Sequence, residues 1–179
     1  GTLGDWNRPP ISVELKEGTK HIMTGHTVIT QDNPRVLVGI GVLKRQISLD
    51  SLSDIYNPKE DKNSSTISDF WDKRIVRRPY PIPEISTTLQ KLESFTYATA
   101  LDLNMGYYTI RLDPEASEIC TIIFPWGKYS YKRLPMGFGG SADIFQAQMM
   151  DLMASLEYVR AYIDDLLIIT RGTLDDHIE

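Results

Sequence analysis

Two adjacent carboxylates, Asp164 and Asp165, stand between two apolar runs near the C-terminal end of the sequence. The run before them, 158–163, is aromatic and β-branched, and the run after them, 166–170, is typical of a buried strand. Strand, acidic pair and strand predict a hairpin with both carboxylates at its tip. Two like charges side by side repel, and a bound divalent cation would turn that repulsion into ligation. From these residues alone, a Mg²⁺ site and a solvated Asp-Asp turn both stay open.

A third carboxylate, Asp102, lies near the end of a strand-like stretch, 95–103. If this strand neighbours the acidic hairpin in one sheet, three carboxylates meet at one edge. Hard oxygen ligands select Mg²⁺ or Mn²⁺. Two such ions about 3.5–4 Å apart can activate a 3′-hydroxyl and stabilise a pyrophosphate leaving group. A different Mg²⁺-dependent phosphotransferase would need the same carboxylates.

The surrounding elements must position these side chains. Prolines at alternating positions in 75–83 favour an extended path, and apolar spacing after Glu84 predicts a helix through Leu92. Further expected elements are a hairpin (119–124 and 129–133), a glycine-rich loop (134–140), a helix capped by Ser141 and running to Leu156, and a helix opened by Thr173. Upstream, 11–16 alternates like a short strand, and 47–68 has a loop composition. The order predicts an α+β fold, an antiparallel sheet with helices on one face.

Composition narrows the class of protein. The chain has 179 residues, 41% of them hydrophobic and 24% charged, as in globular domains. Its formal net charge of −5 is unusual for a free-standing nucleic-acid binder, so any basic surface must be local or lie in parts not present. No apolar run approaches 18 residues and no signal peptide is visible, which predicts no membrane contact and no secretion.

The cysteine and histidine content excludes two common site types. The one cysteine, Cys120, cannot build a disulfide framework, lies in a β-like run and is expected in the core. A single cysteine also favours an intracellular setting, in the cytoplasm or the nucleus. Three scattered histidines and one cysteine do not have zinc-site spacing.

Three motifs now agree in order and spacing. Residues 162–165 (Tyr-Ile-Asp-Asp) resemble the Tyr-x-Asp-Asp box of reverse transcriptases. Residues 101–107 resemble the first catalytic-aspartate motif, with an aromatic residue five positions after Asp102. Residues 134–146 resemble the Leu-Pro-x-Gly…Ser-Pro-x-x-Phe-Gln motif. The segment 74–179 therefore resembles the RNA-directed DNA polymerase of a Ty3/gypsy-type long-terminal-repeat retrotransposon polyprotein.

The resemblance implies the fingers and palm of a right-hand polymerase. It divides the chain into an N-terminal connection (1–35), partial fingers (36–83) and a palm (84–179) truncated before the thumb. It implies addition of deoxynucleotides to a primer 3′-end on an RNA or DNA template, with two Mg²⁺ ions, or Mn²⁺, as cofactors. The thumb, RNase H and integrase of the polyprotein would lie outside this chain.

The resemblance also assigns residues by position. The implied metal ligands are Asp102, Asp164, Asp165 and the backbone carbonyl of Leu103. The residues implied to contact the nucleotide are Leu103, Tyr107, Met136 and Lys59. The residues implied to lie near primer or template are Tyr162, Gln146, Lys73, Arg74, Arg77 and Arg78. Tyr107 would stack under the sugar and exclude a 2′-hydroxyl. Without the motif, a tyrosine buried in the core is an equally good interpretation of this residue. A solvated basic face is the alternative for the cluster 73–78.

Some positions depart from the family pattern. Ser65 stands where the family has an arginine on the triphosphate, and a serine cannot supply that bidentate, charged contact. Ala142 stands where the motif usually has proline, and two residues are missing near 68–74. We therefore expect a partial or decayed copy. The alternative function is a catalytically inactive fragment, at most a weak nucleic-acid-binding or interaction module.

Overall fold

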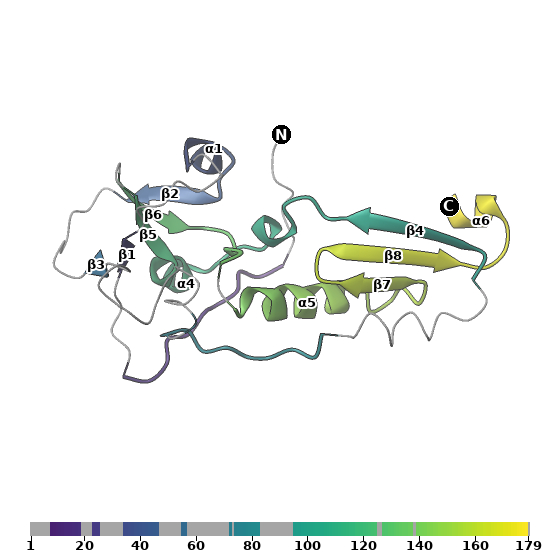
Figure 1. Cartoon of the computed structure of the whole chain (residues 1–179), viewed down its shortest axis with the longest axis horizontal. Helices are drawn as coiled ribbons and strands as arrows, with labels where there is room; N and C mark the ends of the chain where they lie inside the picture. Colours follow the sequence, from purple (N-terminus) through teal and green to yellow (C-terminus); the bar gives the residue numbers. More distant parts are fainter. Residues whose placement is uncertain are drawn as a thin grey trace. The chain divides into compact units, whose positions relative to one another are not determined.

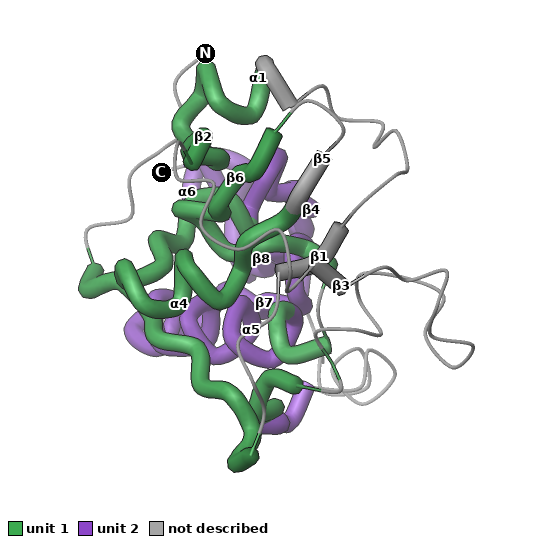
Figure 2. The backbone as a smooth tube through the Cα atoms, turned by 90° about the vertical axis from the view of Figure 1, so that its left-hand side faces the viewer, with its two compact units in different colours: residues 1–77, 107–141 green, residues 78–106, 142–179 purple. Residues whose placement is uncertain are grey.

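The computed structural model describes residues 8–18, 23–25, 34–46, 55–56, 72, 74–82, 95–124, 127–137 and 139–178. They form two compact units, coloured separately in Figure 2. Unit 1 comprises residues 1–77 and 107–141, and unit 2 comprises residues 78–106 and 142–179. The chain thus enters each unit twice. Residues 107–141 belong to the same unit as the N-terminal residues. The division into a connection (1–35), fingers (36–83) and palm (84–179) stays a prediction.

Unit 1 contains a five-stranded sheet in the order β2-β6-β5-β1-β3. The strands are β1 Met23–Gly25, β2 Leu43–Gln46, β3 Ile55–Tyr56, β5 Thr121–Phe124 and β6 Gly127–Tyr131. The expected hairpin in 119–133 is present as the antiparallel pair β5–β6. Strand β1 pairs in parallel with both β3 and β5. These parallel pairs bring together segments far apart in the sequence, which local alternation cannot reveal.

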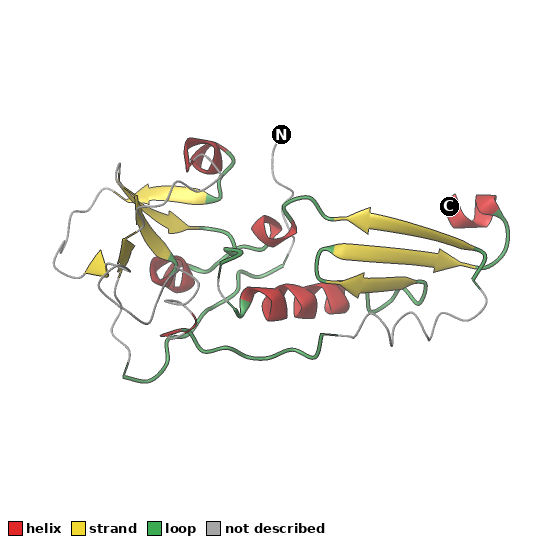
Figure 3. Cartoon of the chain, viewed as in Figure 1, coloured by secondary structure: helices red, strands yellow, loops and turns green. Residues whose placement is uncertain are grey.

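The helices of unit 1 are short (Figure 3). They are α1 Pro34–Gly39 and α4 Pro114–Ile119, and a 3₁₀ turn, η2, spans Gly106–Thr109 where the chain passes from unit 2. Sequence analysis did not predict α4. Its signal was present: Asp113 caps the helix, because its Oδ1 accepts a hydrogen bond from the N–H of Ala116 at 2.7 Å, and proline occupies the first turn.

The N-terminal segment does not form the predicted strand at 11–16. Instead it makes isolated bridges near its two ends, Ile11 with Leu112 and Leu15 with Ile75. Each end is hydrogen-bonded to a different segment, for example from the N–H of Ile11 to the carbonyl of Arg111 (2.9 Å). Two different partners cannot make one continuous ladder, which is why the alternating pattern gave no strand.

Unit 2 is built on a three-stranded antiparallel sheet in the order β4-β8-β7. The strands are β4 Tyr97–Asp102, β7 Val159–Tyr162 and β8 Asp165–Thr170. This confirms the expected strand near 95–103 and the C-terminal hairpin. Helix α5 Ser141–Leu152 lies beside β7 (Figure 1). The buried hydrophobic side chains of the helix and sheet are Phe145, Met149, Val159, Ala161 and Leu166.

Helix α5 ends four residues before the predicted end at Leu156. The chain must reverse there to enter β7, and it does so in a turn closed by a hydrogen bond from the N–H of Leu156 to the carbonyl of Met153 (2.9 Å). The expected helix near the C-terminus is α6 Leu174–Ile178. It opens with the expected capping box, since Thr173 and Asp176 exchange side-chain to backbone hydrogen bonds at 2.8 and 3.3 Å.

His177 fixes α6 to the sheet of unit 2. Its Nε2 lies 2.7 Å from the Thr99 hydroxyl on β4, and its Nδ1 lies 2.7 Å from the Thr170 hydroxyl on β8. The predicted helix at 84–92 falls outside the described residues. Within the part of the chain that the structure describes, no helix has the length and apolar character needed to cross a membrane.

The burial of Cys120 gives a direct test of the fold of unit 1. This thiol is fully buried, and desolvation raises its pKa to about 12. A thiol reacts as its thiolate, so iodoacetamide at pH 8 should leave the native chain unlabelled. Mass spectrometry should show complete labelling after denaturation in urea, which serves as the internal control because the chain has one cysteine. Native labelling at the denatured rate would contradict the described packing.

Candidate active site

The register of the sheet in unit 2 places two of the three predicted carboxylates opposite each other. In the β4–β8 ladder Asp102 pairs with Asp165, and in the β7–β8 ladder Tyr162 also pairs with Asp165. The N–H of Leu103 donates to the carbonyl of Asp164 at 2.9 Å, which ties the end of β4 to the turn of the hairpin. Side chains directly opposite in an antiparallel pair are close neighbours, and like charges there destabilise the sheet.

The turn of the hairpin lies one residue earlier than predicted. Its two residues are Ile163 and Asp164, because Asp165 is already the first residue of β8. Ile163 has a φ of 49°, in the left-handed region that β-branched residues rarely adopt. Such a conformation costs on the order of 1–3 kcal/mol and persists only where surrounding contacts hold it.

Gln146 on α5 supplies those contacts. Its side-chain amide donates from Nε2 to the carbonyl of Ala161 (3.0 Å), and its Oε1 accepts from the N–H of Ile163 (2.6 Å). The side chain is 0% exposed. Buried in this way, the side chain holds the backbone around the acidic turn. The position of Gln146 near the template strand stays a prediction. Its place in the motif was visible in the sequence, but its two partners were not.

A close approach of backbone and ring fixes the segment after Asp102. A Cβ added to Gly106 would lie 2.8 Å from Cζ of Phe145, which is fully buried on α5. Only glycine leaves room for the ring at this distance. The N–H of Gly106 also donates to the carbonyl of Leu103 at 3.1 Å. A carbonyl oxygen has a second lone pair, so the metal contact of Leu103 stays a prediction.

Asp164 is the electrostatically strained member of the acidic group. Desolvation raises the pKa of its carboxyl above the ordinary value, and the negative charges of Asp102 and Asp165 raise it further. Its Oδ1 is buried and has no hydrogen-bond partner in the structure. A buried carboxylate oxygen without a donor is costly, and a cation would compensate for it.

The donor set fits a hard divalent cation, since Asp102, Asp164 and Asp165 offer only carboxylate oxygens. Among the described residues, no group of three acidic, histidine or cysteine side chains is gathered closely enough to hold an ion by itself. Mg²⁺ is commonly bound by one or two carboxylates together with substrate phosphates rather than by a closed protein cage.

The other predicted site residues are distributed between the units. Tyr162 lies in unit 2, half-buried at the end of β7, and Arg78 is exposed in the same unit. Those in unit 1 are Tyr107 on η2, Met136 (51% exposed), Arg74 and Arg77. Of these residues, Tyr162 is held next to the acidic group, by its pairing with Asp165 in the β7–β8 ladder. Lys59 and Lys73 lie outside the described residues.

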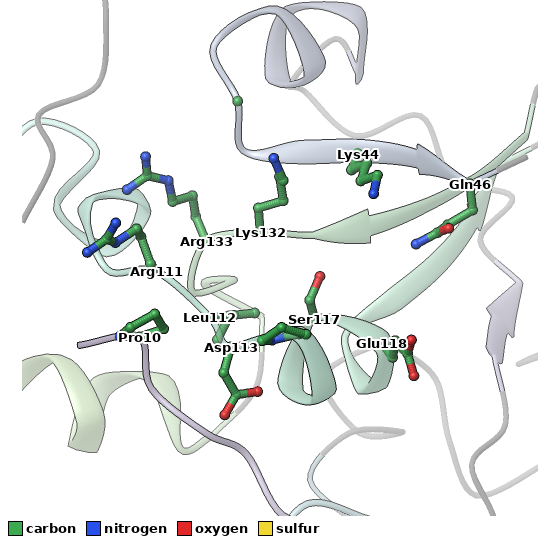
Figure 4. A pocket seen from close by; sticks show the side chains of 12 residues that line it. Pro10, Lys44, Gln46, Arg111, Leu112, Asp113, Ser117, Glu118, Lys132 and Arg133 are labelled. Carbon is green, nitrogen blue, oxygen red and sulfur yellow. The ribbon is translucent and has the colours of Figure 1, made fainter.

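Unit 1 also holds a basic pocket that sequence analysis did not find. It is lined by Lys44, Arg111, Lys132 and Arg133, among other residues (Figure 4). These four basic residues come from three separate segments, so no local cluster in the sequence marks the pocket.

The two hydrogen bonds of Gln146 predict a specific loss of stability. Gln146→Leu replaces the amide with an apolar side chain and leaves the carbonyl of Ala161 and the N–H of Ile163 without these partners. We expect a loss of roughly 1–3 kcal/mol in the free energy of unfolding, measured by urea denaturation. The matched control is Gln148→Leu on the same helix, half-buried, which should cost about 0.5 kcal/mol or less. Equal effects of the two variants would contradict the role of Gln146.

Comparison with protein families gives a match over most of the chain. The model described as reverse transcriptase (RNA-dependent DNA polymerase) matches residues 47–179. A putative enzymatic polyprotein of Cassava vein mosaic virus is 32% identical over 66% of this chain and 19% of its own length. The Pol polyprotein of transposon opus from Drosophila melanogaster is 34% identical over 62% of this chain and 12% of its own length. The chain thus spans less than a fifth of these relatives.

Comparison with solved structures supports the fold. The foamy viral protease–reverse transcriptase in complex with an RNA/DNA hybrid matches 99% of this chain and 25% of its own, with a TM-score of 0.74 and 18% identity. The native prototype foamy virus enzyme matches with a TM-score of 0.67 and 18% identity. At this identity the likeness establishes the fold alone, the α+β fold of polymerase fingers and palm. Since the family model covers well over half of the sequence and includes all three carboxylates, the chain belongs to the reverse transcriptase family.

Proposed function

We propose that this chain is the core of an RNA-directed DNA polymerase that adds deoxynucleotides to a primer 3′-end. The observation that carries the proposal is the register of β4 and β8, which sets Asp102 opposite Asp165, with Asp164 next to Asp165 on the turn. Three carboxylates held at one sheet edge suit a reaction that needs charge neutralisation and positioning more than covalent catalysis.

The reaction joins the primer 3′-oxygen to the α-phosphorus of the incoming deoxynucleotide. The hydroxyl proton leaves to solvent, and the bond to the pyrophosphate oxygen breaks. Two Mg²⁺ ions, or Mn²⁺, would activate the attacking oxygen and stabilise the leaving group when bound. Asp102 and Asp165 would hold them from the two paired strands, and Asp164 from the turn. Phosphate oxygens of the substrate would complete the coordination, in keeping with the incomplete protein ligand set.

We infer a primer–template of RNA or DNA as the partner. Support comes from the family and from the fold, since solved relatives are described in complex with an RNA/DNA hybrid and with double-stranded DNA. Tyr162 would lie at the primer terminus. The basic residues proposed for template phosphates are Lys73, Arg74, Arg77 and Arg78. Met136 and Lys59 would contact the nucleotide. The Ty3/gypsy subtype of the chain and its intracellular location stay predictions.

A second candidate function rests on Ser65. At this position, relatives are expected to carry an arginine that contacts the triphosphate. Ser65 offers neither a positive charge nor a bidentate donor. A chain with an intact acidic edge and a weakened nucleotide contact could bind nucleic acid without polymerising. The two functions differ in one observable, which is extension of a primer.

Primer extension on an RNA template tests the polymerase directly. With Mg²⁺ or Mn²⁺ we expect extension products that disappear in Asp164→Asn, because the variant removes one metal-binding charge while keeping the shape of the side chain. Asp175→Asn, an exposed change on α6, is the control and should leave extension unchanged. A folded chain, by circular dichroism, that extends no primer with either metal would overturn the proposal in favour of the second candidate.

Sugar selectivity tests the proposed role of Tyr107. Tyr107→Ala should remove the ring that excludes a 2′-hydroxyl, so the preference for deoxynucleotides over ribonucleotides should fall by about tenfold or more. Loss of roughly 1.4 kcal/mol of discrimination corresponds to that factor. Tyr107→Phe keeps the ring and should preserve the preference. If the ratio of kcat/KM values stays the same in Tyr107→Ala, Tyr107 does not set sugar selectivity.

A further inference from the structure

The basic pocket of unit 1 has a volume of about 380 Å³, within the general range for small-ligand sites. The ends of β2 and β6 form one side of it, and Ser117 and Glu118 of α4 line the other (Figure 4). All of its lining residues belong to unit 1, and none is one of the active-site carboxylates.

Strand register puts two lysines on the same face of the sheet. Lys44 of β2 pairs with Ser130 of β6, and Lys132 follows Ser130 by two residues, so the three side chains share a face. The Ser130 hydroxyl lies 2.7 Å from that of Thr121 and accepts from Nε2 of Gln46 at 2.8 Å. This polar network fixes the strands beneath the two lysines, which are themselves exposed.

Two arginines enter the pocket from neighbouring segments. Arg111 and Arg133 pair in an isolated antiparallel bridge. A guanidinium N–H of Arg111 donates to the carbonyl of Arg8 at 3.0 Å, and one of Arg133 donates to the carbonyl of Thr109 at 3.2 Å. Backbone carbonyls thus help to hold both side chains in place. A guanidinium carries five N–H donors, which suits it to phosphate oxygens.

Basic residues outnumber acidic ones in the lining of the pocket. Only Asp113 and Glu118 are acidic among the residues that line the pocket. Oδ1 of Asp113 caps α4 through the N–H of Ala116, and in Figure 4 its carboxylate points away from Lys44 and Lys132. The pocket is therefore basic, although the whole chain has a net charge of −5. Such local concentration of positive charge favours binding of phosphate groups.

We propose that this pocket binds the phosphate backbone of a nucleic-acid strand. The choice of a strand as the ligand rests on the proposed function, and the phosphate chemistry rests on the pocket itself. Each backbone phosphate carries one charge, and consecutive phosphates along a strand would meet Lys44 and Lys132 on the sheet and the two arginines beside them. The pocket then supplies the local basic surface that an acidic chain needs in order to hold nucleic acid.

Salt dependence of binding is the decisive measurement. The full chain is titrated into a fluorescent primer–template without divalent metal or nucleotide, and anisotropy is followed from 50 to 200 mM salt. The logarithm of the affinity falls as the logarithm of the salt concentration rises. Each lost phosphate contact should make this negative slope shallower by about 0.7–0.9. We expect this change in Lys44→Gln and in Lys132→Gln, and about twice as much in the double variant.

Arg45→Gln is the matched control, because the substitution removes the same charge as each lysine variant. Arg45 is exposed and follows Lys44 on β2, so its side chain points to the opposite face of the sheet. It should leave the slope unchanged. Equal slopes for the Lys44, Lys132 and Arg45 variants would overturn the proposal. A second result would also overturn it: calorimetry shows that the pocket binds inorganic pyrophosphate, and the lysine variants lose this binding but still bind the strand normally. That result would assign the pocket to a small anion.

The binding assay separates this proposal from the polymerase proposal. It contains no metal and no nucleotide, so a chain that fails in primer extension can still show the slope change. A chain that extends primers with unchanged slopes in the lysine variants would retain the polymerase function and lose the phosphate pocket.

Discussion

The opposition of Asp102 and Asp165 across the β4–β8 ladder is the constraint on which the rest of unit 2 depends. Like charges facing each other in a sheet repel, so other contacts must hold the strands in this register. Six residue pairs, from Tyr97–Thr170 to Asp102–Asp165, fix the two strands along their length. Gln146 fixes the left-handed turn at Ile163 from beneath, and the fully buried Phe145 packs against Gly106. Apolar burial and buried hydrogen bonds thus sustain an acidic edge that favours binding of a cation.

Much of this arrangement followed from the sequence, because local patterns determine it. Alternating and apolar runs predicted β4, the β5–β6 hairpin and the C-terminal hairpin, and Ser141 and Thr173 marked the starts of α5 and α6. Asp102 at the end of its strand followed from the same pattern. These features depend on neighbours in the chain, which a single sequence shows.

The features that the sequence did not predict depend on distant partners. The two-unit division needs 107–141 to pack with residues before 77. The partners of Gln146 lie 15 and 17 residues away, and the shift of the turn to Ile163 depends on them. The failed strand at 11–16 pairs with two segments that lie far along the chain. The basic pocket gathers Lys44 with residues near 111 and 132 only through sheet register.

We propose that the acidic edge of unit 2 binds divalent cations, and Mn²⁺ binding tests this proposal most directly. Electron paramagnetic resonance follows free Mn²⁺ as the chain is added. We predict saturable binding that weakens by about tenfold or more in Asp165→Asn, since that exposed carboxylate is lost from the ligand set. Asp175→Asn on α6 should bind like the unaltered chain. Identical Mn²⁺ isotherms for the unaltered chain and Asp165→Asn would contradict the central claim.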